Sequence, residues 1–172
     1  ALAGRPAQEP NAERLSAARC RAAQALQAAV LGELQELGMA KAAFEVRVTS
    51  GALDEAALGP HGLDVIEFLI SPNPGESLKP LHKIASGGEL SRVMLAIRTI
   101  LAAADRTPSV IFDEVDSGIG GSMGEVVGRK LLAASRRHQV LCVTHLPQIA
   151  CFGDHHLVVQ KRSLGDRTET TV

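Results

Sequence analysis

The stretch SVIFDEVDSGIGG, residues 109–121, joins a short apolar run to two adjacent carboxylates and a glycine-rich segment. Residues 110–112 have the composition of a buried strand, and Asp113 and Glu114 follow at its carboxyl end. Ligands of open α/β sheets gather at the carboxyl ends of strands. Two neighbouring acids repel each other unless a cation or a donor compensates. The stretch therefore predicts a magnesium–phosphate site, with Asp113 holding Mg²⁺ through water and Glu114 acting on an attacking water.

A second apolar run, QVLCVTH at residues 139–145, ends in His145. If the two runs form neighbouring parallel strands, His145 lies at the same edge of the sheet as the acid pair and can donate to a phosphate. Zinc is a weaker alternative for the Cys and His residues of this region. Cys142 and His145 are three apart and would point to opposite faces of a strand, so Cys142 is better interpreted as a small buried apolar residue.

The stretch KIASGGELSRVMLAI, residues 83–97, opens an apolar helical run with a serine, two glycines and a glutamate. Ser86 and Glu89 form a capping-box pattern. Capping does not explain Gly87 and Gly88, because each glycine costs about 1 kcal/mol relative to alanine inside a helix. Glycines leave the first amides bare, and a helix N-terminus attracts anions, so we expect a phosphate here. Arg92 lies one turn after Glu89 and is a weaker candidate for this site. An i,i+3 ion pair with Glu89 explains its position equally well.

The rest of the chain predicts one α/β domain that follows a long helix. Residues 1–10 contain two prolines and are expected to be a flexible lead-in. Residues 11–38 have helical periodicity, which suits either a core helix or the end of a coiled coil that enters the domain. Strands alternating with helices in the second half indicate a partly parallel sheet. Further elements are strands at 43–50 and 63–71, helices to about 104 and at 122–137, and a hairpin at the carboxyl end.

Composition excludes several function classes. With 2% aromatic residues and a net charge of −1, the chain has few rings to stack on bases and is not basic overall, although a local basic patch is possible. Three cysteines without CxxC spacing indicate a reducing compartment. No apolar run reaches the roughly 18 residues that a membrane span needs. A small cluster at Arg136, Arg137 and His138 is expected to be a solvated helix end.

The glycines at positions 118, 120 and 121 do not form a phosphate-binding loop, because the sequence contains no Gly-Lys dipeptide. If the protein hydrolyses a nucleotide, the residues that hold its β- and γ-phosphates lie elsewhere. The chain opens at Ala1 rather than Met. We therefore expect it to be a fragment of a longer protein or a processed chain.

Taken in order, these motifs resemble those of a known family. Residues 85–89 (ASGGE) look like an ABC-type signature motif, residues 110–114 (VIFDE) like a Walker B strand, residues 115–118 like a D-loop, and His145 like a switch histidine. Their order and spacing resemble the carboxyl-terminal lobe of an SMC-like ATPase head, and the wider strings resemble a bacterial DNA repair member. The resemblance implies an α/β head lobe over residues 39–172, preceded by the end of a coiled-coil arm at 11–38.

The resemblance also implies a function. The longer protein would hydrolyse ATP and act in repair or recombination of DNA double-strand breaks. ATP held between two heads would drive head dimerisation and DNA tethering. The expected cofactors and partners are ATP, Mg²⁺, an amino-terminal lobe with the phosphate-binding loop, a second copy of the protein and double-stranded DNA ends. It would work at the nucleoid in the bacterial cytoplasm, without a membrane, and this chain alone would be inactive. The alternatives are another chromosome-organising SMC-like head and a non-catalytic anion-binding module.

Residue roles follow from the same resemblance. Ser86, Gly87, Gly88 and Glu89 would contact the γ-phosphate of ATP bound to the partner head. Asp113 would position Mg²⁺, and Glu114 would polarise the attacking water. Asp116 would bridge across the dimer, and His145 would contact the γ-phosphate.

Overall fold

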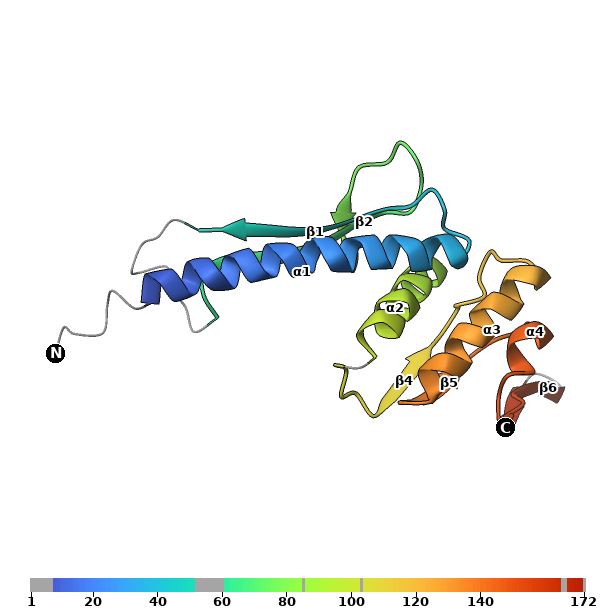
Figure 1. Ribbon diagram of the computed structural model, residues 1–172. Helices are drawn as coiled ribbons and strands as arrows, with labels where there is room; N and C mark the ends of the chain where they lie inside the picture. The colour runs from blue at the N-terminus through green and yellow to red at the C-terminus, as the bar shows by residue number, and fades with distance from the viewer. Residues whose placement is uncertain (1–7, 52–60, 85, 103, 165–166, 172) are drawn as a thin grey trace.

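The computed structural model describes residues 8–51, 61–84, 86–102, 104–164 and 167–171. Its most prominent feature is α1 (Gln8–Glu36), a helix of 29 residues that is about 44 Å long at 1.5 Å per residue (Figure 1). The long helix predicted from periodicity is thus confirmed, although it begins three residues earlier than expected. Most of the predicted lead-in, residues 1–7, lies outside the described residues.

Helix α1 packs along an antiparallel hairpin of β1 (Ala43–Ser50) and β2 (Asp64–Ser71). β1 presents alternate side chains to the helix, as its apolar–polar sequence predicts, and Phe44 joins the core. Arg19 of α1 holds the end of the hairpin where Ser50 pairs with Asp64. Its guanidinium lies 2.8 Å from the carboxylate of Asp64. A short strand β3 (Lys79–Pro80) pairs with β2, and a 3-10 turn (Leu81–Lys83) leads to the next helix. Among the described residues of α1, the buried side chains are Ala23, Val30 and Leu34, and Leu37 is buried just beyond the end of the helix.

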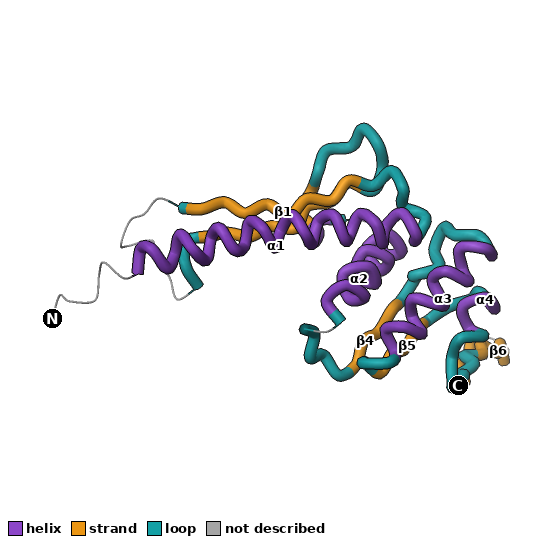
Figure 2. The backbone as a smooth tube through the Cα atoms, in the orientation of Figure 1, coloured by secondary structure: helices purple, strands orange, loops and turns teal. Residues whose placement is uncertain are grey.

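The second half alternates helices and strands, as predicted. α2 (Gly87–Leu101) is followed by β4 (Ser109–Phe112), α3 (Gly121–Ser135) and β5 (Gln139–Cys142). β4 and β5 pair in parallel, which confirms the parallel portion that the alternation indicated. Figure 2 shows α2 and α3 lying beside this two-stranded sheet and below the carboxyl end of α1. The core continues from α1 into these elements through Val93, Leu95, Phe112 and Val127.

The last elements are a short helix α4 (Pro147–Ala150) and a hairpin of β6 (Gln160–Leu164) and β7 (Arg167–Thr171). The predicted carboxyl-terminal hairpin is therefore confirmed. Gly128 lets α3 approach Phe152 closely, because a Cβ atom at this position would lie 2.3 Å from the ring. Among the described helices, none combines the length and the apolar character that a bilayer crossing requires.

Two contacts far apart in sequence fix α3. Lys130 places its Nζ atom 2.7 Å from a carboxylate oxygen of Glu33 and 2.7 Å from one of Glu36, which ties α3 to α1. His138 directs Nδ1 to the carbonyl oxygen of Thr107 at 2.6 Å and is buried. The basic cluster was therefore predicted correctly only in part. Arg136 and Arg137 are exposed, but the third member is a core contact.

Candidate functional site

The polar side chains that follow β4 and β5 lie at one edge of the sheet. The amide of Val143 donates to the carbonyl oxygen of Phe112 at 2.9 Å and so extends the parallel pairing beyond the last strand residues. Asp113 and Glu114 come directly after one strand, and His145 follows the other. This placement confirms the expectation that the acid pair and the histidine share an edge.

The buried carboxylate of Asp116 joins the two strand ends. One of its oxygens, Oδ2, accepts from the hydroxyl of Thr144 at 2.5 Å and from the amide of His145 at 2.9 Å. The same oxygen lies 3.1 Å from Nδ1 of His145. Burial opposes ionisation of Asp116, but these hydrogen bonds and the neighbouring imidazole outweigh it, so the pKa of Asp116 lies below its ordinary value. Its carboxylate thus has partners within its own chain.

Because Nδ1 of His145 is directed at Asp116, Nε2 is the ring nitrogen left for a ligand. The side chain of His145 is 77% exposed, so a ligand can reach it. Asp116, by contrast, was expected to face a second molecule, and it is only 4% exposed. The structure therefore presents His145 outward and keeps Asp116 behind it.

The start of α2 lies against the turn that follows β4. Ser86 caps the helix, with its Oγ accepting from the amide of Glu89 at 3.4 Å. A Cβ atom on Gly88 would lie 2.6 Å from Cβ of Ser117 and 2.9 Å from the carbonyl oxygen of Glu114. Gly88 is thus required by packing within the chain. This explains one of the two glycines that capping left unexplained, without a ligand.

Gly87 differs from Gly88. A Cβ atom on Gly87 would lie 2.3 Å from Oε2 of Glu114, which is the movable end of a flexible side chain. Gly87 and Ser86 are exposed. The amides of a helix's first turn have no intrahelical acceptors. The open end of α2 and the Glu114 carboxylate therefore lie side by side at the molecular surface.

Glu114 has a backbone φ of 55°, a value in the left-handed region that non-glycine residues seldom adopt. The turn is closed by the amide of Ser117, which donates to the carbonyl oxygen of Glu114 at 2.9 Å. Such strained residues cost about 1–3 kcal/mol and cluster at functional sites. The left-handed backbone conformation sets the direction in which the Glu114 side chain leaves the turn. Glu114 is the residue that the sequence analysis assigns to the attacking water.

Arg92 does not form the predicted ion pair with Glu89. It is buried, and its guanidinium donates to the carbonyl oxygen of Ser117 at 2.8 Å. Burial lowers the pKa of Arg92, and the charge of Glu89 only partly offsets this. The i,i+3 interpretation was wrong because it considered one helix face and not the turn that packs on it.

A metal at this edge would need ligands from outside the acid pair. Among the described residues, no group of three or more His, Cys, Asp or Glu side chains is placed to hold a metal ion. Asp113 and Glu114 are exposed. Mg²⁺ usually keeps several waters and is bound by one or two carboxylates together with phosphate oxygens. The Asp113–Glu114 pair fits Mg²⁺ held together with a nucleotide. The described Cys and His residues form no cluster that could bind zinc.

Cys142 is half-buried and packs against the hydrophobic core, so the expectation of a small buried apolar residue is confirmed only in part. Burial raises the pKa of its thiol to about 11, and the charges of Asp116 and Asp113 act in the same direction. The thiol is therefore protonated at neutral pH and a poor metal ligand or nucleophile.

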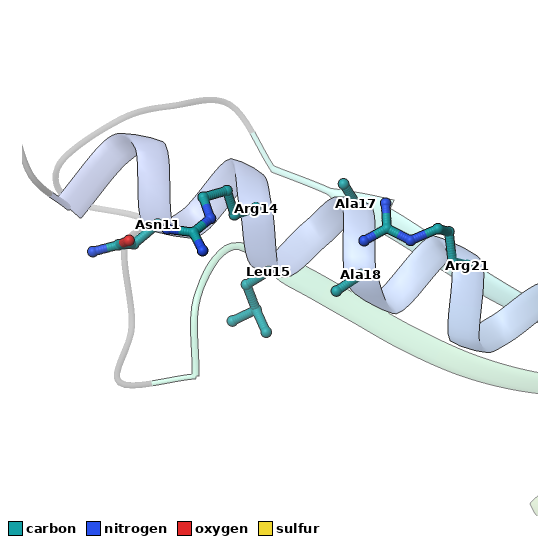
Figure 3. A pocket seen from close by; sticks show the side chains of 6 residues that line it. All are labelled: Asn11, Arg14, Leu15, Ala17, Ala18 and Arg21. Atoms are coloured by element: carbon teal, nitrogen blue, oxygen red, sulfur yellow. The ribbon is translucent and has the colours of Figure 1, made fainter.

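A shallow hollow of about 510 Å³ lies on α1 (Figure 3). It is an open face of one helix, and Figure 1 shows this part of α1 far from β4 and β5. It does not belong to the site at the strand ends. The hollow is lined by Asn11, Arg14, Leu15, Ala17, Ala18 and Arg21.

Solved structures with a similar arrangement are head domains of Smc proteins. One, the Smc head domain with a coiled coil and joint from Pyrococcus yayanosii, has a TM-score of 0.54, is 16% identical and covers 88% of this chain and 27% of that one. Another, the Smc head domain with an extended coiled coil from Pyrococcus furiosus bound to the C-terminal domain of ScpA, has a TM-score of 0.53 and 15% identity, covering 88% and 35%. The chain has the α/β fold of the carboxyl-terminal lobe of an SMC-type head.

Sequence relatives narrow the class. DNA repair protein RecN of Treponema pallidum is 47% identical over 161 residues, which are 91% of this chain and 28% of that protein. RecN of Vibrio cholerae is 47% identical over 159 residues, 92% and 28%. RecN of Streptomyces coelicolor is 43% identical over 169 residues, 94% and 30%. The chain belongs to the RecN family and spans less than a third of the length of these relatives. It matches no protein-family model.

Proposed function

We propose that this chain is the carboxyl-terminal lobe of an ATP-hydrolysing head in an SMC-like DNA repair protein. ATP would join two heads and so tether double-stranded DNA ends in the bacterial cytoplasm, at the nucleoid. The observation that carries the proposal is the parallel pairing of β4 and β5. It brings the Asp113–Glu114 pair and His145 to one edge, where Asp116 links them.

In the proposed reaction each group at this edge has a separate task. The Glu114 carboxylate orients and polarises the attacking water. His145 donates from Nε2 to the γ-phosphate when its ring is an imidazolium, with Nδ1 held on Asp116. Asp113 would hold hydrated Mg²⁺, which would supply positive charge to offset that of the phosphate oxygens. Catalysis of this kind is mostly positioning and charge stabilisation.

The start of α2 would act on a nucleotide bound to a second copy. Ser86 offers its hydroxyl and Gly87 its amide at an exposed helix N-terminus, where an anion is favoured. Gly88 would also supply its amide, and Glu89 completes the motif. Asp116 is assigned here to orienting His145, because its carboxylate already has partners within the chain.

An exposed apolar face of the β4–β5 sheet is evidence for a lobe that packs on it. Ile111 is 69% exposed, Leu141 45% and Val143 60%, all at the β4–β5 pair or just beyond it. Contiguous exposed apolar surface marks an interaction site. We propose that an amino-terminal lobe of the same protein covers this face and brings the phosphate-binding loop that the sequence of this chain lacks.

The exposed face of α1 is consistent with its being part of a coiled-coil arm. Small residues there are exposed at alternating steps of four and three, the spacing of a heptad seam. A Cβ atom added at Gly32 would meet nothing within 4 Å, so this face is open. We propose that a returning helix packs on it. The seam residues are Ala18, Ala22, Ala25, Ala29 and Gly32.

The proposal is tested in the full-length protein with Glu114→Gln. We expect ATP binding to persist, dimers to accumulate with ATP in light scattering, and turnover to fall by about 10²–10⁴-fold. Wild-type turnover would remove Glu114 from the mechanism. If Glu114→Gln retains every cellular function, the result favours the alternative function, a non-catalytic anion-binding module.

The contact in trans needs a different variant. Ser86→Arg places a bulky side chain at the open end of α2 and should abolish dimerisation while leaving ATP binding intact. Ser122→Arg is the control, because Ser122 is likewise an exposed serine at the start of a helix, α3. Normal dimerisation of Ser86→Arg would contradict the proposal.

A further inference from the structure

Arg92 is a buried cation whose partners are backbone carbonyls. Only 8% of the residue is exposed. Nη1 donates to the carbonyl oxygen of Ser117 at 2.8 Å and reaches that of Val115 at 3.5 Å. Nε has no hydrogen-bond partner among the described residues. Arginine stays protonated at neutral pH, so a full charge lies here without an ion pair among the described residues, and Glu89 acts on it only through its nearby charge.

Stability alone accounts poorly for this arrangement. Moving a charge out of water costs several kcal/mol, and hydrogen bonds to carbonyls return about 1.5–3 kcal/mol each. An apolar side chain of similar volume would avoid the cost. What only the guanidinium offers is a fixed contact with the carbonyls on both sides of Asp116.

These carbonyls belong to the turn that carries the candidate catalytic groups. Val115 and Ser117 flank Asp116, whose carboxylate holds Thr144 and the amide of His145. The turn begins at the strained Glu114. A displacement of the turn would therefore move Glu114 and His145 together.

Two further contacts join the same turn to α2. Ser91 donates from Oγ to the carbonyl oxygen of Asp113 at 2.5 Å. Gly88 allows the helix to lie directly on Ser117 and Glu114. Gly88 only packs against the far side of the turn, whereas Arg92 forms a hydrogen bond to it, at the carbonyl oxygen of Ser117.

We propose that Arg92 is a positioning residue that locks the 113–117 turn to α2, so that occupation of the α2 N-terminus by a phosphate sets the placement of Glu114 and His145. The inference rests on the proposed function, since it takes that phosphate to be the one on the second copy. The two ATP sites of a dimer are then coupled through each chain's own Arg92. The coupling is reciprocal, as linkage requires of binding.

The test compares Arg92→Met and Arg92→Lys with Arg129→Met in the full-length protein. Arg129 is an exposed α3 residue in an i,i+4 pair with Glu125 and serves as the arginine control. Hydrogen exchange by mass spectrometry, without nucleotide, reports on peptides covering 113–119 and 143–146. We expect Arg92→Met to speed exchange in both peptides, and kcat to fall about 10–100-fold with KM unchanged. Arg92→Lys should give a smaller effect, and the control none.

Each other outcome decides the matter. Wild-type exchange in both peptides of Arg92→Met overturns the lock, and faster exchange with unchanged kcat overturns the link to catalysis. If Arg92→Met does not fold, Arg92→Lys with wild-type exchange and kcat overturns the proposal as well. Absence of ATP hydrolysis in the wild-type protein would instead refute the proposed function, and the exchange data would still decide whether Arg92 holds the turn.

Discussion

The carboxylate of Asp116 accepts a hydrogen bond from the backbone amide of His145 at 2.9 Å, although the two residues are 29 positions apart. The bond closes the gap between the ends of two parallel strands. A protonated Asp116 accepts these bonds more weakly, so the contact depends on pH. The exposed His145 ring therefore depends on a buried neighbour for its place.

We predict that Asp116→Asn lowers stability in a pH-dependent way. The folded-state pKa of Asp116 lies below its ordinary value, so its ionised form stabilises the fold above about pH 4, and this contribution is lost as pH falls through the lower folded value. Urea unfolding of the chain should show a difference from wild type of about 1–2 kcal/mol at pH 7 that shrinks towards pH 2. Asp154→Asn, at an exposed site, is the control. A difference that stays constant with pH would contradict the assignment.

The two glycines that open α2 should respond differently to alanine. Gly88→Ala forces a Cβ atom against backbone and should cost about 1–3 kcal/mol in unfolding free energy. Gly87→Ala meets only the movable end of Glu114 and should be neutral or slightly stabilising, because alanine favours helix. Thermal and urea unfolding of both variants measure this. Equal losses would refute the packing assigned to Gly88.

Relief of the strain at Glu114 should raise stability. Glycine adopts a φ of 55° without steric cost, so Glu114→Gly should gain about 1 kcal/mol. Asp113→Gly is the matched control: it lies one residue earlier, is not among the residues with positive φ, and should lose stability because glycine frees the unfolded chain. Urea unfolding decides between them, and losses in both would mean that the turn is unstrained.

Polar substitutions on the bare sheet face should matter only when the partner lobe is present. Threonine is β-branched and suits a strand, so Ile111→Thr and Leu141→Thr should change the unfolding free energy of this chain alone by at most about 0.5 kcal/mol. In the full-length protein each should cost about 1.5–3 kcal/mol through lost burial, seen as faster proteolysis. Leu132→Gln is the control, because Leu132 is an exposed apolar residue on α3, away from this sheet face. Unchanged full-length stability would argue against a lobe docked on this face.

Local sequence patterns were sufficient for the elements and for the edge where the polar residues meet. Apolar runs that end in Asp113 and His145 identified the two strand ends, and alternation with helices indicated that the strands are parallel. The hairpin of β6 and β7 followed from its composition and spacing. These features depend on periods of two or 3.6 residues, which a sequence displays directly.

Contacts between elements could not be predicted in the same way. The burial of Arg92 depends on a turn 25 residues later, and the ion pair expected with Glu89 considered only the helix itself. Gly88 matches a helix opening in sequence, but the atom that excludes a side chain is the carbonyl oxygen of Glu114. The positive φ of Glu114 has no signal at all, because glutamate does not ordinarily occupy that region.

The contact between Gly88 and Ser117 has a consequence for how loss-of-function alleles are interpreted. A substitution at Gly88 disrupts the fit of two elements before any ligand arrives, whereas one at Gly87 leaves that fit almost untouched. The same inactive phenotype in a genetic screen would then have two separate origins at adjacent codons. Only the Gly87 allele would report on ligand recognition, and the Gly88 allele would behave as a folding lesion that lower growth temperature relieves.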